Sequence, residues 1–212
     1  MVEQEGDTQS RQYSREQAVA LALFDAVAGK LPNKARRLLL LAVAAHAGAA
    51  QRPDQSDRAG RDRVLAARLP HLNAQHQAII ASAVALQRAK VRPQRESAFV
   101  WLDKKERSTA LYLAAVMRVA GAADVEPGDL LVQCDGDKTT VTIGGPRAEQ
   151  ALAAVEERAA LWRDQIGELV AAAEPGALVV VRPTGAEAEL DEGNRHRQLR
   201  GCARPNRPAG RP

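Results

Sequence analysis

Seven basic side chains lie within twenty residues of one another in the middle of the sequence, and only three acidic residues oppose them. The basic residues are Arg88, Lys90, Arg92, Arg95, Lys104, Lys105 and Arg107. A chain of phosphates is held by several Lys and Arg side chains along a groove, because each neutralised phosphate releases counterions. The stretch is therefore a candidate polyanion-binding edge, and we add Arg118, further along the chain, to its candidate residues. The alternative is a solvated loop and helix start.

Two aromatic residues, Phe99 and Trp101, lie inside this basic stretch. An exposed aromatic pair beside basic residues could stack on a nucleic-acid base. The alternative, which we prefer, is that Trp101 anchors the loop to the core.

Helical periodicity and capping signals predict that these residues belong to a mainly α-helical chain. Asp103 and Glu106 have the spacing of a capping box, which predicts the start of a long helix ending near residue 123. Asn73 is expected to cap another helix, and residues 91–98 are expected to form a loop. The predicted helices cover residues 14–30, 33–50, 61–68, 74–90 and 103–123.

The pattern changes after residue 125 and predicts a small β-β-α unit. A strand beginning at Leu130, a turn at Asp135-Gly136-Asp137 and a returning strand over 139–143 are typical of a β-hairpin. A helix is predicted over 147–164. One further strand is predicted at 168–172 or at 177–182.

This layout divides the chain into four parts. We expect a disordered N-terminus (1–12), a helical domain (13–125), an α+β appendage (126–182) and a disordered tail rich in Arg, Pro and Gly (183–212). The whole chain has a formal charge of +4, but residues 194–212 contain six arginines and no acidic residue. Residues 1–193 therefore carry −2, so the sequence does not predict a basic nucleic-acid-binding domain.

Length and composition favour a cytoplasmic protein. The 212 residues are enough for one domain with a small appendage, and aromatic residues make up only 3% of them. No apolar run reaches 18 residues, and the acidic N-terminus is unlike a signal peptide. Cys134 and Cys202 lie in different contexts, which favours reduced thiols.

Five runs, taken in order and spacing, carry a likeness to a known family. They are Val19–Val27, Ala35–Gly48, Gln77–Lys90, Leu111–Asp124 and Ala151–Trp162. The layout resembles the C-terminal region of the exopolyphosphatase and guanosine pentaphosphate phosphohydrolase enzymes. The resemblance implies an HD-type (His-Asp phosphohydrolase) helical domain followed by a small α+β piece.

The same resemblance implies that the metal site of the HD domain is degenerate. The family's adjacent His-Asp pair reads His46-Ala47 here, and alanine has no ligand atom. A downstream histidine position reads Gln87, and a late aspartate position reads Gly121. His46 and Asp124 are remnant positions, and we interpret His46 as a buried histidine that donates to a backbone carbonyl. One His and one Asp do not hold a divalent metal, so no cofactor is expected.

The family's catalytic site lies in N-terminal domains with glycine-rich phosphate loops, which this sequence does not contain. The resemblance thus implies a stand-alone, non-catalytic module. Its expected ligand is a phosphate-rich anion (polyphosphate or a nucleotide), a phosphorylated small molecule, or a partner protein that carries catalytic domains. A homodimer is one candidate assembly, and no membrane association is expected. One alternative is a metal-dependent phosphohydrolase that uses a divalent metal. Another is a protein-interaction module acting through the Arg-rich tail.

Overall fold

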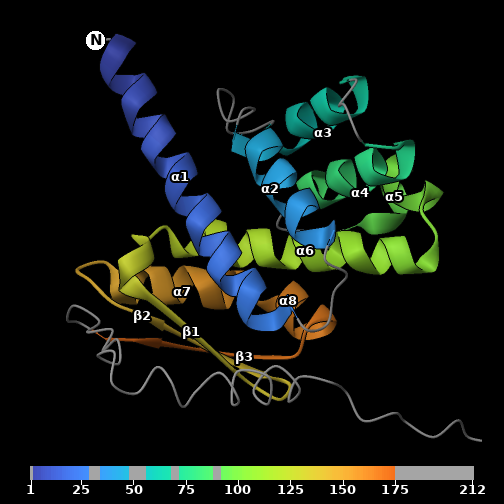
Figure 1. Ribbon diagram of the computed structural model, residues 1–212. Helices are drawn as coiled ribbons and strands as arrows, with labels where there is room; N and C mark the ends of the chain where they lie inside the picture. The colour runs from blue at the N-terminus through green and yellow to red at the C-terminus, as the bar shows by residue number, and fades with distance from the viewer. Residues whose placement is uncertain (1, 29–33, 48–55, 68–71, 88–91, 175–212) are drawn as a thin grey trace, which may run out of the picture.

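Helix α6 (Lys104–Ala123) runs through the centre of the molecule, and the other elements pack around it (Figure 1). The structure is a computed structural model that describes residues 2–28, 34–47, 56–67, 72–87 and 92–174. The other helices of the body and a small α+β unit cover α6 from different sides, and the first helix of the body crosses it. The mainly helical body with a small α+β unit is as the sequence predicted. The body helices are α1 (Val2–Val27), α2 (Lys34–Ala47), α3 (Ser56–Ala66), α4 (Ala74–Ala85) and α5 (Ser97–Trp101).

The start of α6 is fixed by the predicted capping box. The Glu106 N–H donates to Asp103 Oδ1 (2.8 Å), and the Asp103 N–H donates to Glu106 Oε2 (3.0 Å). Further along, residues 112–120 are buried without interruption. A helix buried on every face must be central, because it has no side to turn towards water.

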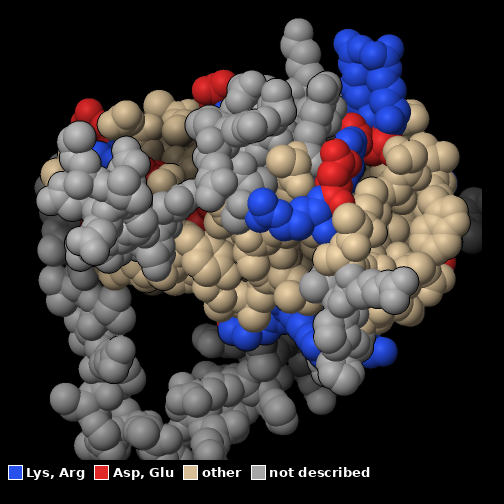
Figure 2. Space-filling model, turned by 90° about the horizontal axis from the view of Figure 1, so that it is seen from above, with Lys and Arg blue, Asp and Glu red and all other residues tan. Residues whose placement is uncertain are grey.

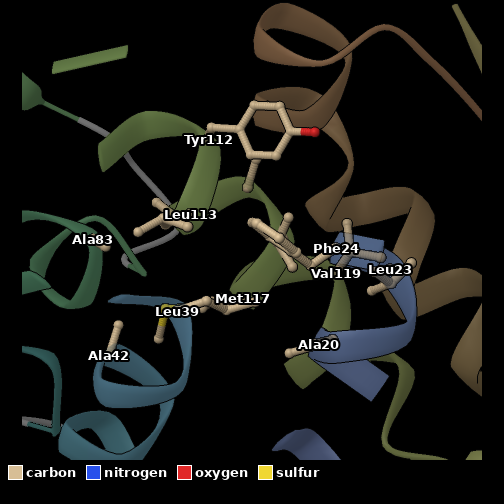
Figure 3. Packing of buried hydrophobic residues seen from close by; sticks show 14 of the residues in the cluster. Ala20, Leu23, Phe24, Leu39, Ala42, Ala83, Tyr112, Leu113, Met117 and Val119 are labelled. Atoms are coloured by element: carbon tan, nitrogen blue, oxygen red, sulfur yellow. The ribbon is translucent and has the colours of Figure 1, made fainter. Parts of the chain in front are cut away.

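Alanines and a few larger aliphatic side chains let neighbouring helices approach α6 closely. In Figure 3, side chains from α1, α2 and α4 meet those of α6. The labelled residues there are Ala20, Leu23, Phe24, Leu39, Ala42, Ala83, Tyr112, Leu113, Met117 and Val119. The buried Tyr112 hydroxyl also donates to the Val27 carbonyl (3.0 Å), which ties the end of α1 to α6.

The α+β unit contains a three-stranded sheet. Strands β1 (Leu130–Asp135) and β2 (Lys138–Ile143) form the predicted antiparallel hairpin, whose turn contains Gly136 at φ 59°. The chain then forms α7 (Ala148–Arg158) and α8 (Ala160–Gln165) before returning as β3 (Glu168–Ala173), parallel to β2. Helices α7 and α8 contact both α6 and the sheet, and the fully buried Trp162 of α8 belongs to the same hydrophobic core as the body.

Several predicted boundaries were wrong. Helix α1 begins at Val2, not at residue 14; residues 2–13 contain no proline, and half of them are the good helix formers Glu, Gln and Arg. The expected disordered N-terminus is therefore helical from Val2. The expected loop 91–98 contains a short 3₁₀ helix (Pro93–Arg95) and the start of α5, and the helix predicted over 147–164 is interrupted at Ala159.

Other expectations held or lie outside the described residues. The Asn73 side chain caps α4 by accepting from the His76 N–H (2.8 Å). Of the two places considered for a last strand, the structure has one at Glu168–Ala173, whereas 177–182 and the tail from residue 183 lie outside the described residues.

We expect Gly60→Ala to destabilise the protein, although alanine is the better helix former. A Cβ on Gly60 of α3 would lie 2.8 Å from the buried Val84 Cγ1 and 3.0 Å from the Ala45 carbonyl oxygen. Neither atom can move freely, so the free energy of unfolding should fall by about 1–3 kcal/mol in urea titrations. Gly121→Ala in α6 is the matched control, because its Cβ meets only Glu16 Oε1 at 3.6 Å. The control should gain up to about 1 kcal/mol; equal effects of the two variants would contradict the close packing.

Candidate anion-binding site

The exposed indole of Trp101 lies where α5 ends and α6 begins. Trp101 is 61% exposed and Val100 is 50% exposed, whereas Phe99 is 8% exposed. The expectation that Trp101 anchors the loop was therefore wrong, because Phe99 fills the core position and leaves Trp101 facing water.

Arg107 holds this corner of the molecule in place. Its Nε donates to the Phe99 carbonyl (3.1 Å), its Nη2 donates to the Val100 carbonyl, and its guanidinium lies 5.8 Å from the centre of the Phe99 ring. These contacts fasten the first turns of α6 to α5. Arg107 is half-buried and bonds to the backbone just before Trp101, unlike the exposed cations of this region.

Four of the predicted anion-binding residues lie on either side of Trp101 in the chain. Arg92, Arg95, Lys104 and Lys105 are exposed, and none of them forms an ion pair within the described part of the chain. We call these four residues, together with Val100 and Trp101, the α5–α6 surface. The predicted residues Arg88 and Lys90 lie outside the described residues.

The acidic residues near the α5–α6 surface are engaged elsewhere. Glu96 is buried and pairs with Arg61 of α3 (2.9 Å), and Asp103 and Glu106 form the capping box. The cations of the surface therefore form no ion pairs with these acidic neighbours. Lys104 and Lys105 also lie in the first turn of α6, where the helix dipole adds positive potential.

Arg118 does not belong to this surface. It lies 14 residues after Lys104 on the same helix, which corresponds to about 21 Å along the helix axis. It is only 5% exposed, and its Nε donates to the Leu86 carbonyl (2.8 Å). The structure thus divides the predicted anion-binding residues into an exposed group and a buried one.

The two remnant metal positions, His46 and Asp124, lie at the ends of two different helices. His46 is half-buried in the last turn of α2, where a basic group is favoured by the helix dipole. Asp124 ends α6 in the left-handed conformation (φ 40°), and Arg147 donates to its Oδ2 (3.3 Å) and to its carbonyl (3.2 Å). Among the described residues, no group of three or more His, Cys, Asp or Glu side chains is placed to hold a metal ion.

Sequence reasoning missed Glu16 of α1, which lies against the end of α6. Burial, and secondly the charge of Asp124, raise the pKa of Glu16 to about 7. Its neighbour Arg15 pairs with Glu126 (2.6 Å), so that cation is already engaged. Glu16 was missed because the sequence analysis began this helix at residue 14 and so placed Glu16 in its first turn, whereas the helix begins at Val2.

Two further features of the described residues are the spread of charged side chains over the surface and the apolar content of the helices. On the face seen in Figure 2, Lys and Arg side chains stand in separate groups, with acidic side chains beside some of them. None of the described helices combines the length and apolar composition needed to cross a membrane.

No family model matches the sequence, and no curated protein is significantly similar to it.

We expect Glu16→Gln to make the protein more stable at neutral and higher pH. Folded Glu16 keeps its proton up to about pH 7, whereas the unfolded chain loses it near pH 4.5. The free energy of unfolding of the wild-type protein therefore decreases as pH rises through this window. Glutamine removes that loss, so the variant should gain on the order of 1–3 kcal/mol relative to wild type between pH 4.5 and pH 8.

Urea titrations at several pH values measure this difference. Glu157→Gln, at an exposed position of α7, is the control with the same chemical change. A stability difference that does not vary with pH for Glu16→Gln would show that the carboxyl titrates normally in the folded protein.

Proposed function

We propose that this protein is a stand-alone, non-catalytic relative of the C-terminal domain of exopolyphosphatases that binds a phosphate-rich anion, polyphosphate or a nucleotide. The observation that carries the proposal is the α5–α6 surface. It has four exposed cations without a carboxylate partner in the described chain, beside an exposed tryptophan.

The chemistry of the surface suits such a ligand. Each phosphate that meets a Lys or Arg releases condensed counterions, which drives binding of a polyanion. The Trp101 ring can stack on a base if the anion is a nucleotide, a contact worth about 1–3 kcal/mol. Val100 and Trp101 are adjacent members of the small set of exposed large hydrophobic residues in the described chain, which also includes Leu65 and Leu131.

The mainly helical body followed by a small α+β unit agrees with the architecture that the resemblance implies. The metal-ligating positions of that family support a binding role over hydrolysis, because Asp124 is engaged with Arg147 and closes α6. A catalytic partner protein remains part of the proposal, since the phosphate-cleaving domains of the family would have to be supplied by another chain.

We expect the double variant Lys104→Glu/Lys105→Glu to weaken polyphosphate binding and to reduce its salt dependence. Removing two phosphate contacts should lower the slope of log K against log salt by about 1.4. Fluorescence anisotropy with labelled polyphosphate, measured between roughly 50 and 200 mM salt, follows both quantities. Acidic residues are favoured in the first turn of a helix, so the variant should fold.

The control is Lys34→Glu/Arg37→Glu, which makes the same change of net charge at exposed positions near the start of α2. Both variants keep the six arginines of the tail, which can bind a polyanion themselves. Equal losses in the two double variants would reject the α5–α6 surface as the binding site and favour a general charge effect or the tail.

A further inference from the structure

Arg118 is a charged side chain placed inside the helical core. Residues on both sides of it in α6 are buried, and Arg118 itself is only 5% exposed. Among the described residues one other charged side chain is classed as buried, Glu96, and its charge is balanced by Arg61 at 2.9 Å. Arg118 forms no ion pair with any described carboxylate.

One bond of Arg118 has a structural explanation. Its Nε donates to the carbonyl of Leu86 (2.8 Å), the residue that caps the C-terminal end of α4. A cation is favoured at that end of a helix. This contact is weaker than the penalty for removing an unpaired ion from water, and it leaves Arg118 Nη2 buried with no acceptor.

Two further described groups, Gln87 and Arg158, add a donor and a cation to the surroundings of Arg118. The Nε2 of Gln87, the residue that follows Leu86, is also buried without an acceptor. Burial, and secondly the charge of Arg158 at the end of α7, lower the pKa of Arg118 to about 10. Arg118 therefore stays protonated at neutral pH. Arg158 has no ion pair within the described chain either.

We propose that Arg118 and Arg158, helped by the Gln87 side-chain amide, bind a single oxyanion of the phosphate type between α4, α6 and α7. An anion would give Arg118 Nη2 its missing acceptor and would offset the repulsion between the two guanidinium groups. Guanidinium groups bind tetrahedral oxyanions through paired N–H donors. A dianion such as phosphate balances two arginines, whereas a single carboxylate balances only one.

This site goes beyond the proposed function and does not depend on it. Arg118 lies far along α6 from Lys104 and Lys105, and it takes one phosphoryl group, whereas the α5–α6 surface takes a chain of charges. A phosphorylated small molecule is the class of ligand that fits it.

The test uses the full chain and inorganic phosphate as the probe. Thermal unfolding is followed with increasing sodium phosphate, with ionic strength held constant by sodium chloride, and calorimetric titration gives the stoichiometry. Wild type should be stabilised saturably by phosphate with one site per chain, because a ligand that binds only the folded state stabilises it by mass action. Arg158→Ala, at an exposed position, should fold and lose at least tenfold in phosphate affinity.

Arg37→Ala is the matched control, since Arg37 is exposed on α2 and lies away from α6 in sequence. It should keep the wild-type affinity. A second variant, Arg118→Lys, keeps the charge but lacks the paired donors, and it should also bind phosphate more weakly. Phosphate stabilisation that is absent in wild type, or unchanged in Arg158→Ala, would overturn the proposal.

The double variant Lys104→Glu/Lys105→Glu separates this proposal from the proposed function. It should keep the phosphate-specific stabilisation while it loses polyphosphate affinity. If it loses the phosphate effect and Arg158→Ala keeps it, phosphate binds at the α5–α6 surface and the Arg118 site is rejected.

Discussion

The burial of α6 on every face is the constraint on which the rest of the structure depends. Residues 112–120 have no side towards water, so α1, α2, α4, α7 and α8 must all be in place before α6 is covered. The body and the α+β unit therefore share one hydrophobic core. The Tyr112–Val27 hydrogen bond joins positions 85 residues apart and satisfies two polar groups that this burial removes from water.

The same constraint gives the charges along α6 different surroundings. At its exposed start, Lys104 and Lys105 reach solvent beside Trp101, and Asp103 and Glu106 are engaged in capping. In its buried centre, Arg118 keeps a full charge with a carbonyl as its only described acceptor. At its end, Asp124 adopts a left-handed conformation and is held by Arg147. One helix thus carries an exposed cationic surface, a buried cation and an anionic cap.

Features encoded within a few residues could be predicted from the sequence. The Asp103–Glu106 capping box, the Asn73 cap and the Asp135–Lys138 hairpin depend on side chains and turns that act on neighbouring backbone. They placed the starts of α4 and α6 and the first two strands correctly, whereas the helix predicted to end near residue 90 ends at Ala85. The start of α1 was missed because residues 2–13 are polar and were expected to be disordered, although such a stretch is compatible with a helix.

The direction in which a side chain faces depends on distant residues and could not be predicted in this way. Arg107 and Lys105 are close in sequence, yet Arg107 turns towards the carbonyls of α5 and Lys105 faces solvent. Arg118 was added to the candidate anion-binding residues for its charge alone, and its burial depends on the packing of α6 against distant parts of the chain. The raised pKa of Glu16 depends on the packing of α1 against the end of α6, which the residues near Glu16 in sequence do not indicate.

The central claim, that a phosphate-rich anion binds at the α5–α6 surface, is tested most directly with the two tryptophans. The chain contains Trp101, which is exposed, and Trp162, which is fully buried. Their indole N–H resonances can be assigned with Trp101→Phe and followed by NMR during a polyphosphate titration at constant ionic strength. The account predicts a saturable shift of the Trp101 resonance and an unchanged Trp162 resonance. A Trp101 resonance that stays in place at the highest polyphosphate concentration would contradict it.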